Sequence, residues 1–330
     1  MRAPPELKFC NGRALRVIGV HDPLSAIVAS GGAWDALWVS SFGVSASSFG
    51  LSDIGLVTLS EMMDTVRRMK AVSDVPIILD ADTGYGDLLN VRRLVLESTR
   101  VGVDGVCIED AAFPKRNSFL DRTHRCMASV DEMCGRVAMA ARTRGGRGPL
   151  VIARTEALNQ ALPMAEAIAR AAAYTDAGAD AILVHSSDPS GDEVFRFAAE
   201  WDRPVPLVVV PTRYPDVPLQ RYDQAGIGAV ILANQLLRAS FRALRETSEA
   251  LAAAAAPDAV SPTIDSMEAV HEALGTLRQL ELADEVSRQA ATQSARSAAA
   301  ARQGGGLIDA AESREAEELF ASRVAASSVR

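Results

Sequence analysis

Residues 75–86 read VPIILDADTGYG, a β-branched apolar run that ends in two carboxylates and a glycine-rich turn. The pattern recurs in residues 105–118, GVCIEDAAFPKRNS, where Glu109 and Asp110 follow the apolar run. Short runs of this kind are typical of strands buried on both faces of a parallel sheet. Carboxylates just past a buried strand are costly to desolvate unless a cation lies among them. The two stretches therefore predict parallel strands with a charged site at their carboxyl ends.

Apolar runs of this kind occur eight times, and sequence with helical periodicity fills the intervals. The predicted strands are Arg16–Val20, Ala36–Ser40, Val75–Asp80, Gly105–Glu109, Leu150–Arg154, Ala181–His185, Pro206–Val210 and Ala229–Leu232. The predicted helices between them include Leu59–Ala71, Leu89–Val101, Val130–Arg144, Pro163–Ala177 and Gly191–Trp201. A doubly wound sheet would use the same units, but eight repeats favour a (β/α)8 TIM barrel, an α/β fold.

The 330 residues suffice for one barrel with a C-terminal helical extension. We expect a long helix after Asn234, one amphipathic helix over Ser266–Leu280, and a break in the tail at the glycines 304–306. The predicted organisation is an N-terminal arm at 1–14, a catalytic barrel at 15–256, a helical segment at 257–280 and a helical or disordered tail at 281–330.

Composition narrows the class of partner. A formal net charge of −8 argues against binding to nucleic acid or to an anionic membrane. No apolar run reaches membrane-spanning length and the N-terminus lacks a signal core, so we expect a soluble, cytoplasmic protein. The cysteines show no paired spacing, which favours reduced thiols; they are Cys10, Cys107, Cys126 and Cys134. His124 and Cys126 lack a second pair of ligands and do not predict zinc.

Working residues of a TIM barrel lie at the carboxyl ends of its strands. Asp80, Asp82 and Glu109 end neighbouring strands and supply the oxygen ligands that Mg²⁺ prefers, with water and substrate completing the shell. In the alternative interpretation, Asp82 caps the following helix and Asp80 binds nearby amides. The three carboxylates together favour the magnesium site.

Cationic residues also gather at these predicted strand ends. Arg154 and His185 end the fifth and sixth strands and could clamp an anion with charge-assisted hydrogen bonds; the alternative is a pair of core residues. The polar loop after Glu109 contains Lys115, Asn117 and Ser118. We interpret it as a lid that closes over the mouth and excludes water, with a solvated loop as the alternative.

Five segments together carry a family resemblance, and they are residues 80–86, 109–118, 153–157, 177–185 and 210–212. From residue 15 to residue 280 the chain resembles the isocitrate lyase and phosphoenolpyruvate mutase superfamily. Carbon–carbon lyases of that superfamily carry an acid–base cysteine on the lid, within a Lys-Lys/Arg-Cys-Gly-His segment. Residues 115–118 here read KRNS, which favours the phosphoenolpyruvate phosphomutase branch.

The resemblance implies a Mg²⁺-dependent enzyme that interconverts phosphoenolpyruvate and 3-phosphonopyruvate, a small-molecule reaction of phosphonate biosynthesis. It implies a homodimer or homotetramer whose terminal helices are exchanged between barrels. It also assigns roles by position. Asp80, Asp82 and Glu109 hold the metal; Trp38, Ser40 and Ser41 bind the substrate carboxylate; Arg154, His185 and Asn117 grip the phosphoryl group; Lys115 and Ser118 belong to the lid, with Asp53 on a neighbouring loop.

Three positions depart from the family pattern. Ala111 and Ser187 stand where basic residues are usual, and Ser41 stands where mutases commonly have glycine. A changed substrate therefore stays open. The remaining interpretations are a phosphonopyruvate hydrolase, a lyase or another 2-oxo- or 2-hydroxy-acid enzyme, and a non-catalytic barrel subunit. Similar hydrolases have threonine on the lid where this chain has Asn117.

Overall fold

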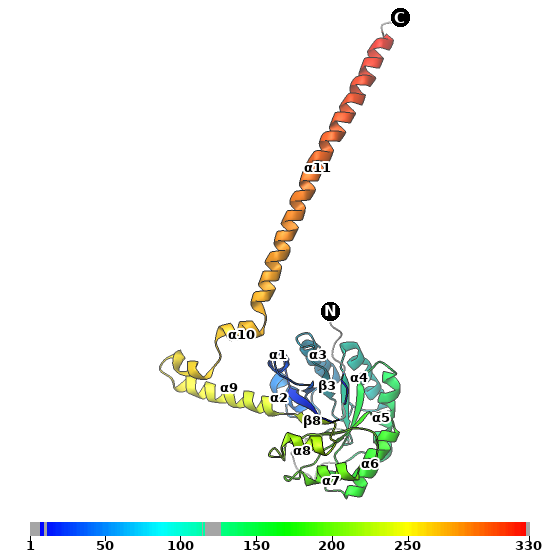
Figure 1. Ribbon diagram of the computed structural model, residues 1–330, viewed down its shortest axis with the longest axis vertical. Coiled ribbons are helices and arrows are strands. Elements are labelled where there is room, and N and C mark those ends of the chain that lie inside the picture. Colours follow the sequence, from blue (N-terminus) through cyan, green and yellow to red (C-terminus); the bar gives the residue numbers. More distant parts are fainter. Residues whose placement is uncertain (1–6, 10–11, 114, 116–126, 328–330) are drawn as a thin grey trace. The chain divides into compact units, whose positions relative to one another are not determined.

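The computed structural model describes residues 7–9, 12–113, 115 and 127–327. Its eight strands are parallel and close into a barrel in chain order, with helices around it (Figure 1). They are β1 Leu15–Val20, β2 Ala36–Val39, β3 Ile77–Asp80, β4 Gly105–Glu109, β5 Leu150–Thr155, β6 Ala181–Val184, β7 Leu207–Val209 and β8 Ala229–Leu232. The predicted TIM barrel is confirmed, and every strand lies at its predicted place.

The helices follow the predicted periodicity. They are α1 Pro23–Ser30, α2 Ser41–Phe49, α3 Leu59–Lys70, α4 Leu88–Val101, α5 Val130–Arg144, α6 Met164–Asp176, α7 Asp192–Glu200, α8 Leu219–Gln224 and α9 Gln235–Ala253. Local chemistry sets their ends: Thr58 and Glu61 form a capping box on α3, and Gly102 ends α4 with a φ of 81°. Asp87 rather than Asp82 caps α4.

Side-chain alternation along the strands builds two cores. Leu79 and Ile108 point outward and pack against helices, while Ile78 and Cys107 point inward with Trp38 and fill the barrel. Because side chains alternate between the two faces of a strand, the inward or outward orientation of its last side chain follows from the residues before it. In β3, inward Ile78 and outward Leu79 place Asp80 inward, and the same count applies to Glu109 in β4. The site residues thus form the top layer of the inner core.

After the barrel the chain divides at residue 263 into two compact units, and residues 264–330 form the second. The second unit contains α10 Met267–Ala273 and α11 Thr276–Ser327. The single helix expected over Ser266–Leu280 is wrong, because Gly275 takes a left-handed φ of 67° and ends α10. The break expected at residues 304–306 is also wrong. The α11 backbone continues through them, since glycine keeps the N–H that a helix needs.

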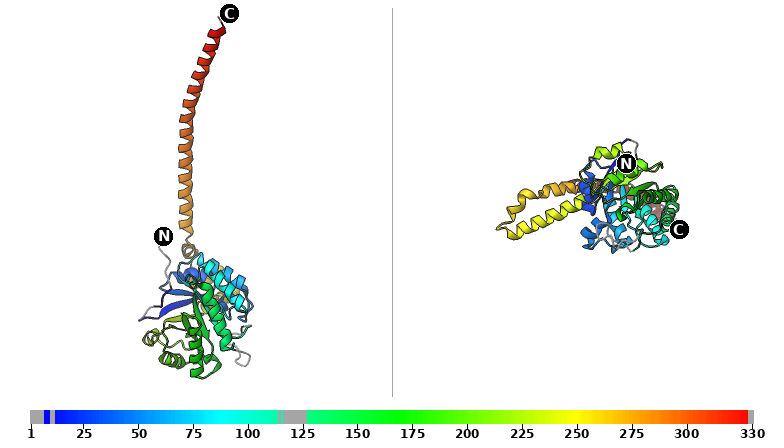
Figure 2. Two further views of the ribbon diagram at one scale, coloured as in Figure 1. Left: turned by 90° about the vertical axis from the view of Figure 1, so that its right-hand side faces the viewer. Right: turned by 90° about the horizontal axis from the view of Figure 1, so that it is seen from below.

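The 3-10 segment η3, Pro257–Thr263, ends the first unit. Helix α9 extends away from the ring of helices in the right-hand view of Figure 2, and none of its residues is buried. No helix within the described residues is both long and apolar enough to cross a membrane. The predicted domain limits stay predictions.

Candidate active site

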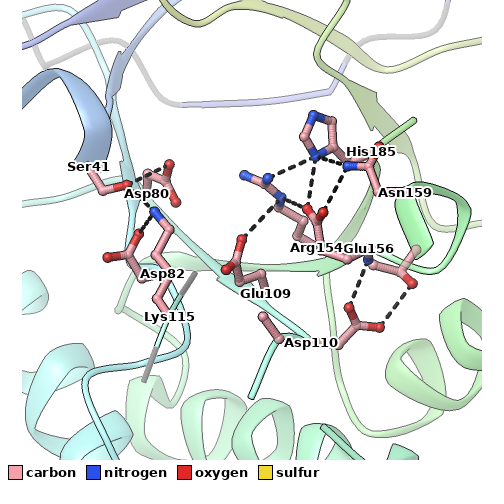
Figure 3. A network of polar contacts seen from close by, with 12 residues as sticks. Ser41, Asp80, Asp82, Glu109, Asp110, Lys115, Arg154, Glu156, Asn159 and His185 are labelled. Carbon is pink, nitrogen blue, oxygen red and sulfur yellow. Dashed lines mark hydrogen bonds and ion pairs between the residues drawn. The ribbon is translucent and has the colours of Figure 1, made fainter. Parts of the chain in front are cut away.

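Lys115 joins the loops that carry Asp82 and Asp53 to the first turn of α2 on one side of the barrel mouth. Its Nζ donates to Asp82 Oδ1 at 2.5 Å, Asp53 Oδ1 at 2.8 Å and Ser41 Oγ at 2.9 Å. Ser41 Oγ in turn donates to Asp80 Oδ2 at 3.2 Å (Figure 3). Burial lowers the pKa of Lys115, but the surrounding carboxylates raise it by more than burial lowers it. The resulting pKa lies well above the usual value for lysine. The ammonium group is therefore charged and neutralises this side of the mouth.

The carboxylates beside Lys115 are held in an environment that disfavours their charge. Burial is the largest cause in each case, and it raises the pKa of Asp82 to about 6 and that of Glu109 to about 8. Within the described residues, both oxygens of Glu109 are buried and accept no hydrogen bond. Arg154 Nε forms an ion pair with Glu109 Oε2 at 3.5 Å. The cost of removing this carboxylate from water is therefore only partly offset by its interactions with the protein.

This donor set fits a hard divalent cation. Asp80, Asp82 and Glu109 offer only oxygen atoms, and the orphaned oxygens of Glu109 would be satisfied by a metal ion or its water ligands. In the described part of the chain, no group of three or more His, Cys, Asp or Glu side chains could hold a metal ion as it stands. The predicted magnesium trio stays a prediction that rests on donor chemistry.

The opposite side of the mouth is built around Arg154 and His185. Arg154 Nε donates to Glu156 Oε1 at 2.6 Å, and its Nη2 lies 2.9 Å from His185 Nδ1. Asn159 Nδ2 lies 2.8 Å from Glu156 Oε2 and 2.7 Å from His185 Nδ1. The structure thus brings the predicted pair together, and it adds two partners to which the sequence analysis gave no role.

Asp110 supports this side from below. The fully buried carboxylate accepts hydrogen bonds from the Glu156 backbone N at 2.8 Å, Thr155 Oγ1 at 3.0 Å and Tyr174 OH at 2.8 Å. It therefore ties the end of β4 to the end of β5 and to α6. In the sequence, the position of Asp110 next to Glu109 and the position of Glu156 just after the fifth strand indicated that both lie near the site. Nothing in the spacing of Asn159 indicated its role.

A cavity of about 60 Å³ lies between the two sides. Seven predicted site residues line it: Trp38, Ser40, Asp53, Asp80, Lys115, Arg154 and His185. Phe42, Thr212 and Asn234 line it as well, although the prediction did not include them. Ser41, Asp82 and Glu109 are not among the lining residues. Asn117 and Ser118 fall outside the described residues.

A closed parallel barrel with buried acids and Lys115 on one side of its mouth and Arg154 with His185 on the other has the architecture of an α/β-barrel enzyme. The chain belongs to the phosphoenolpyruvate phosphomutase family, which it matches over residues 9–252. It is an enzyme of the phosphoenolpyruvate mutase and isocitrate lyase superfamily.

Relatives of more than one activity resemble the chain. The phosphoenolpyruvate phosphomutase of Streptomyces hygroscopicus is 38% identical over 237 residues, 72% of this chain and 75% of that protein. The crystal structure of a phosphoenolpyruvate phosphomutase from Streptomyces platensis subsp. rosaceus matches with a TM-score of 0.80 and 35% identity, covering 82% of this chain and 94% of that one. A phosphonopyruvate hydrolase in complex with oxalate and Mg²⁺ matches with a TM-score of 0.76 and 31% identity, covering 82% and 93%.

Proposed function

We propose that this chain is a phosphoenolpyruvate phosphomutase, which moves a phosphoryl group between the enol oxygen and C3 and so interconverts phosphoenolpyruvate and 3-phosphonopyruvate. One observation carries the proposal: Lys115 and Arg154–His185 line opposite sides of one cavity of about 60 Å³. A loose, metaphosphate-like transition state needs positioning and charge neutralisation more than it needs a nucleophile. Cations on both sides of a small substrate meet that need.

The proposed roles follow the geometry of the mouth. Arg154 neutralises the phosphoryl group and His185 hydrogen-bonds to it throughout its transfer, because both line the cavity; Arg154 is held from behind by Glu156. Trp38, Ser40 and Ser41 receive the carboxylate end. Lys115 and Asp53 close the mouth together, and Asn117 and Ser118 would complete the lid.

Asp80, Asp82 and Glu109 would hold Mg²⁺ in this proposal. The ion would neutralise charge on the substrate oxygens. Lys115 would keep part of this negative charge compensated, since its Nζ contacts Asp82 and Asp53 directly.

The sequence of the lid favours a mutase over a lyase or a hydrolase. A lyase needs a general acid at the departing carbon, and residues 115–118 contain no cysteine. Phosphonopyruvate hydrolase is the second candidate, favoured by the structural match to such an enzyme. Asn117 is the position that separates the two, because the resemblance implies threonine there in hydrolases.

The test is ³¹P NMR of the full chain with Mg²⁺ and phosphonopyruvate. We expect the phosphonate signal to be replaced by that of phosphoenolpyruvate with little free phosphate, and the Asp82→Ala variant to leave the spectrum unchanged. Pyruvate and inorganic phosphate as the main products would replace the mutase assignment with the hydrolase.

We also propose a cytoplasmic homodimer or homotetramer in which terminal helices are exchanged between barrels. Apolar exposure on α9 supports this: Phe241 is 65% exposed, Leu244 71% and Leu251 44%. A second copy of the chain would cover these side chains. Multi-angle light scattering should give a dimer or tetramer mass, and Phe241→Ser with Leu244→Ser should lower it. A monomeric wild type would contradict the proposal.

A further inference from the structure

We propose that Asn159 is a positioning residue that holds His185 in the tautomer with its proton on Nε2. The inference deepens the proposed function, on which it rests for the identity of the substrate, by assigning the atom that meets the anionic group. Asn159 itself does not line the cavity, whereas His185 and Arg154 do.

Three groups converge on one nitrogen of the His185 ring. Arg154 Nη2 lies 2.9 Å from Nδ1, Asn159 Nδ2 lies 2.7 Å from it, and Glu156 Oε1 lies 2.9 Å from it. Figure 3 shows the other ring nitrogen on the side away from all three residues. A ring nitrogen either donates or accepts, and an arginine N–H can only donate.

The orientation of the Asn159 amide is fixed by Glu156. Asn159 Nδ2 lies 2.8 Å from Glu156 Oε2. Turning the amide over would put its oxygen against a carboxylate oxygen at that distance, which is repulsive. Nδ2 has two hydrogens, so it can donate one to Glu156 and the other to His185.

The balance of donors then decides the tautomer. If Nδ1 accepts, the N–H groups of Arg154 and Asn159 face its one lone pair. The cost is that this lone pair lies 2.9 Å from Glu156 Oε1, which Arg154 Nε compensates at 2.6 Å. If Nδ1 carries the proton, it gains Glu156 Oε1 but opposes two N–H groups. The first arrangement satisfies two donors and opposes one pair of acceptors, whereas the second satisfies one donor and opposes two pairs of donors, and all four side chains are buried. The proton of the neutral ring therefore lies on Nε2.

This tautomer has a consequence for binding. Nε2–H donates to an oxygen of an anionic substrate, whereas the other tautomer would present a lone pair to that oxygen and repel it. The Asn159 side chain also carries a cost, because its Oδ1 is buried without a partner. Stabilising the correct form of His185 is a reason to keep an amide at this place.

The full-length protein labelled with ¹⁵N-histidine tests the tautomer directly. The chain has four histidines, and His185→Gln assigns the signal of interest. At the pH of the turnover assay we expect a pyrrole-type Nε2 and a pyridine-type Nδ1. A proton on Nδ1 at that pH, in the neutral or the doubly protonated ring, would overturn the inference.

Variants test the part played by Asn159. Asn159→Asp replaces the donor with an acceptor and should move the proton to Nδ1. Asn159→Leu removes the donor at similar volume and should give a mixture of tautomers, and Gln160→Leu, on the same turn but outside this cluster, should keep the wild-type pattern. If Asn159→Asp does not fold, Asn159→Leu still decides, because an unchanged tautomer in that variant refutes the role.

Kinetics give the second readout. Asn159→Leu should lower kcat roughly 10- to 100-fold, the scale for groups that orient a functional side chain, with a smaller change in KM. An unchanged kcat would refute the role. Because the NMR measurement needs no substrate, hydrolysis in the turnover assay would end the mutase proposal and leave the tautomer standing, while a wrong tautomer in an active mutase would end only this inference.

Discussion

Glu109 and Arg154 are register partners on β4 and β5, yet Arg154 Nε donates to Glu156 at 2.6 Å and stays 3.5 Å from Glu109 Oε2. Arg154 Nε thus pairs with Glu156 on the His185 side of the mouth, and within the described residues the two buried oxygens of Glu109 accept no hydrogen bond. The partial compensation of this carboxylate supports the proposal that a metal ion binds beside it.

The first prediction concerns metal. Excess EDTA should abolish turnover, and Mg²⁺ should raise Tm, because a ligand that binds only the folded state stabilises it by about 2.7 kcal/mol at 100 times Kd. Glu109→Gln should reduce that shift by removing a charged oxygen donor. Asp258→Asn, at an exposed acid in η3, is the control and should behave as wild type. Full turnover in EDTA would exclude a metal requirement.

The second prediction concerns the Asp110 network. Asp110→Ala leaves the Glu156 N–H and the hydroxyls of Thr155 and Tyr174 without their acceptor, and should lower the free energy of unfolding by on the order of 3 kcal/mol. Tyr174→Phe removes one of these donors and should cost about 1 kcal/mol. Urea denaturation measures both, and equal effects would show that the network is not shared.

Much of the site was predictable because strand periodicity determines it. Once Ile78 and Cys107 are inside the barrel, Asp80 and Glu109 must point inward at the mouth. The polar loop after Glu109 predicted that Lys115 lies on a lid over the mouth, but its three partners could not be predicted, since they lie 33, 62 and 74 residues away in sequence. Such contacts depend on loop conformation, which no short-range pattern encodes.

Asn159 and Gly275 are two residues whose structural roles were not predicted from the sequence. Asn159 lies on the short turn Leu158–Gln160 after β5, where an asparagine is ordinary, and its partner His185 comes from another strand. At residue 275 the apolar spacing of the two flanking helices continues without a gap, so periodicity predicted one helix. The glycine at 275 was the local signal against it, since glycine adopts the left-handed φ of 67° that ends α10.

The third prediction is a pH dependence at the opposite end of the barrel. Asp35 accepts from Arg13 Nη2 at 2.7 Å, Arg13 Nη1 at 2.9 Å and the Arg16 backbone N at 2.7 Å. Burial raises the pKa of Asp35, but these hydrogen bonds and charges outweigh it and bring the pKa below 3.8. Because folding lowers this pKa, the stabilisation is present above pH 3.8 and is lost as pH falls through the folded-state value.

Asp35→Asn should therefore cost about 1 kcal/mol at neutral pH, the upper range for a partly exposed ion pair. The difference from wild type should vanish in acid below the folded-state pKa. Asp64→Asn, at an exposed pair on α3, is the control and should have a smaller effect at every pH. A difference for Asp35→Asn that persists unchanged into strong acid would show that charge is not its cause.

The last prediction concerns the lid and separates mutase from hydrolase. Asn117→Ala should lower kcat on the order of 100-fold, as expected when a hydrogen-bond donor to the transition state is removed. Asn117→Thr should keep more turnover but release free phosphate, because the shorter side chain leaves room for water beside the phosphoryl group. Ala112→Ser, on the same loop before the lid, is the control and should leave the product ratio unchanged. The measurement is the ratio of phosphoenolpyruvate to phosphate by ³¹P NMR. If Asn117→Thr gives the wild-type ratio, Asn117 does not control access of water, and the argument for the mutase from this residue fails.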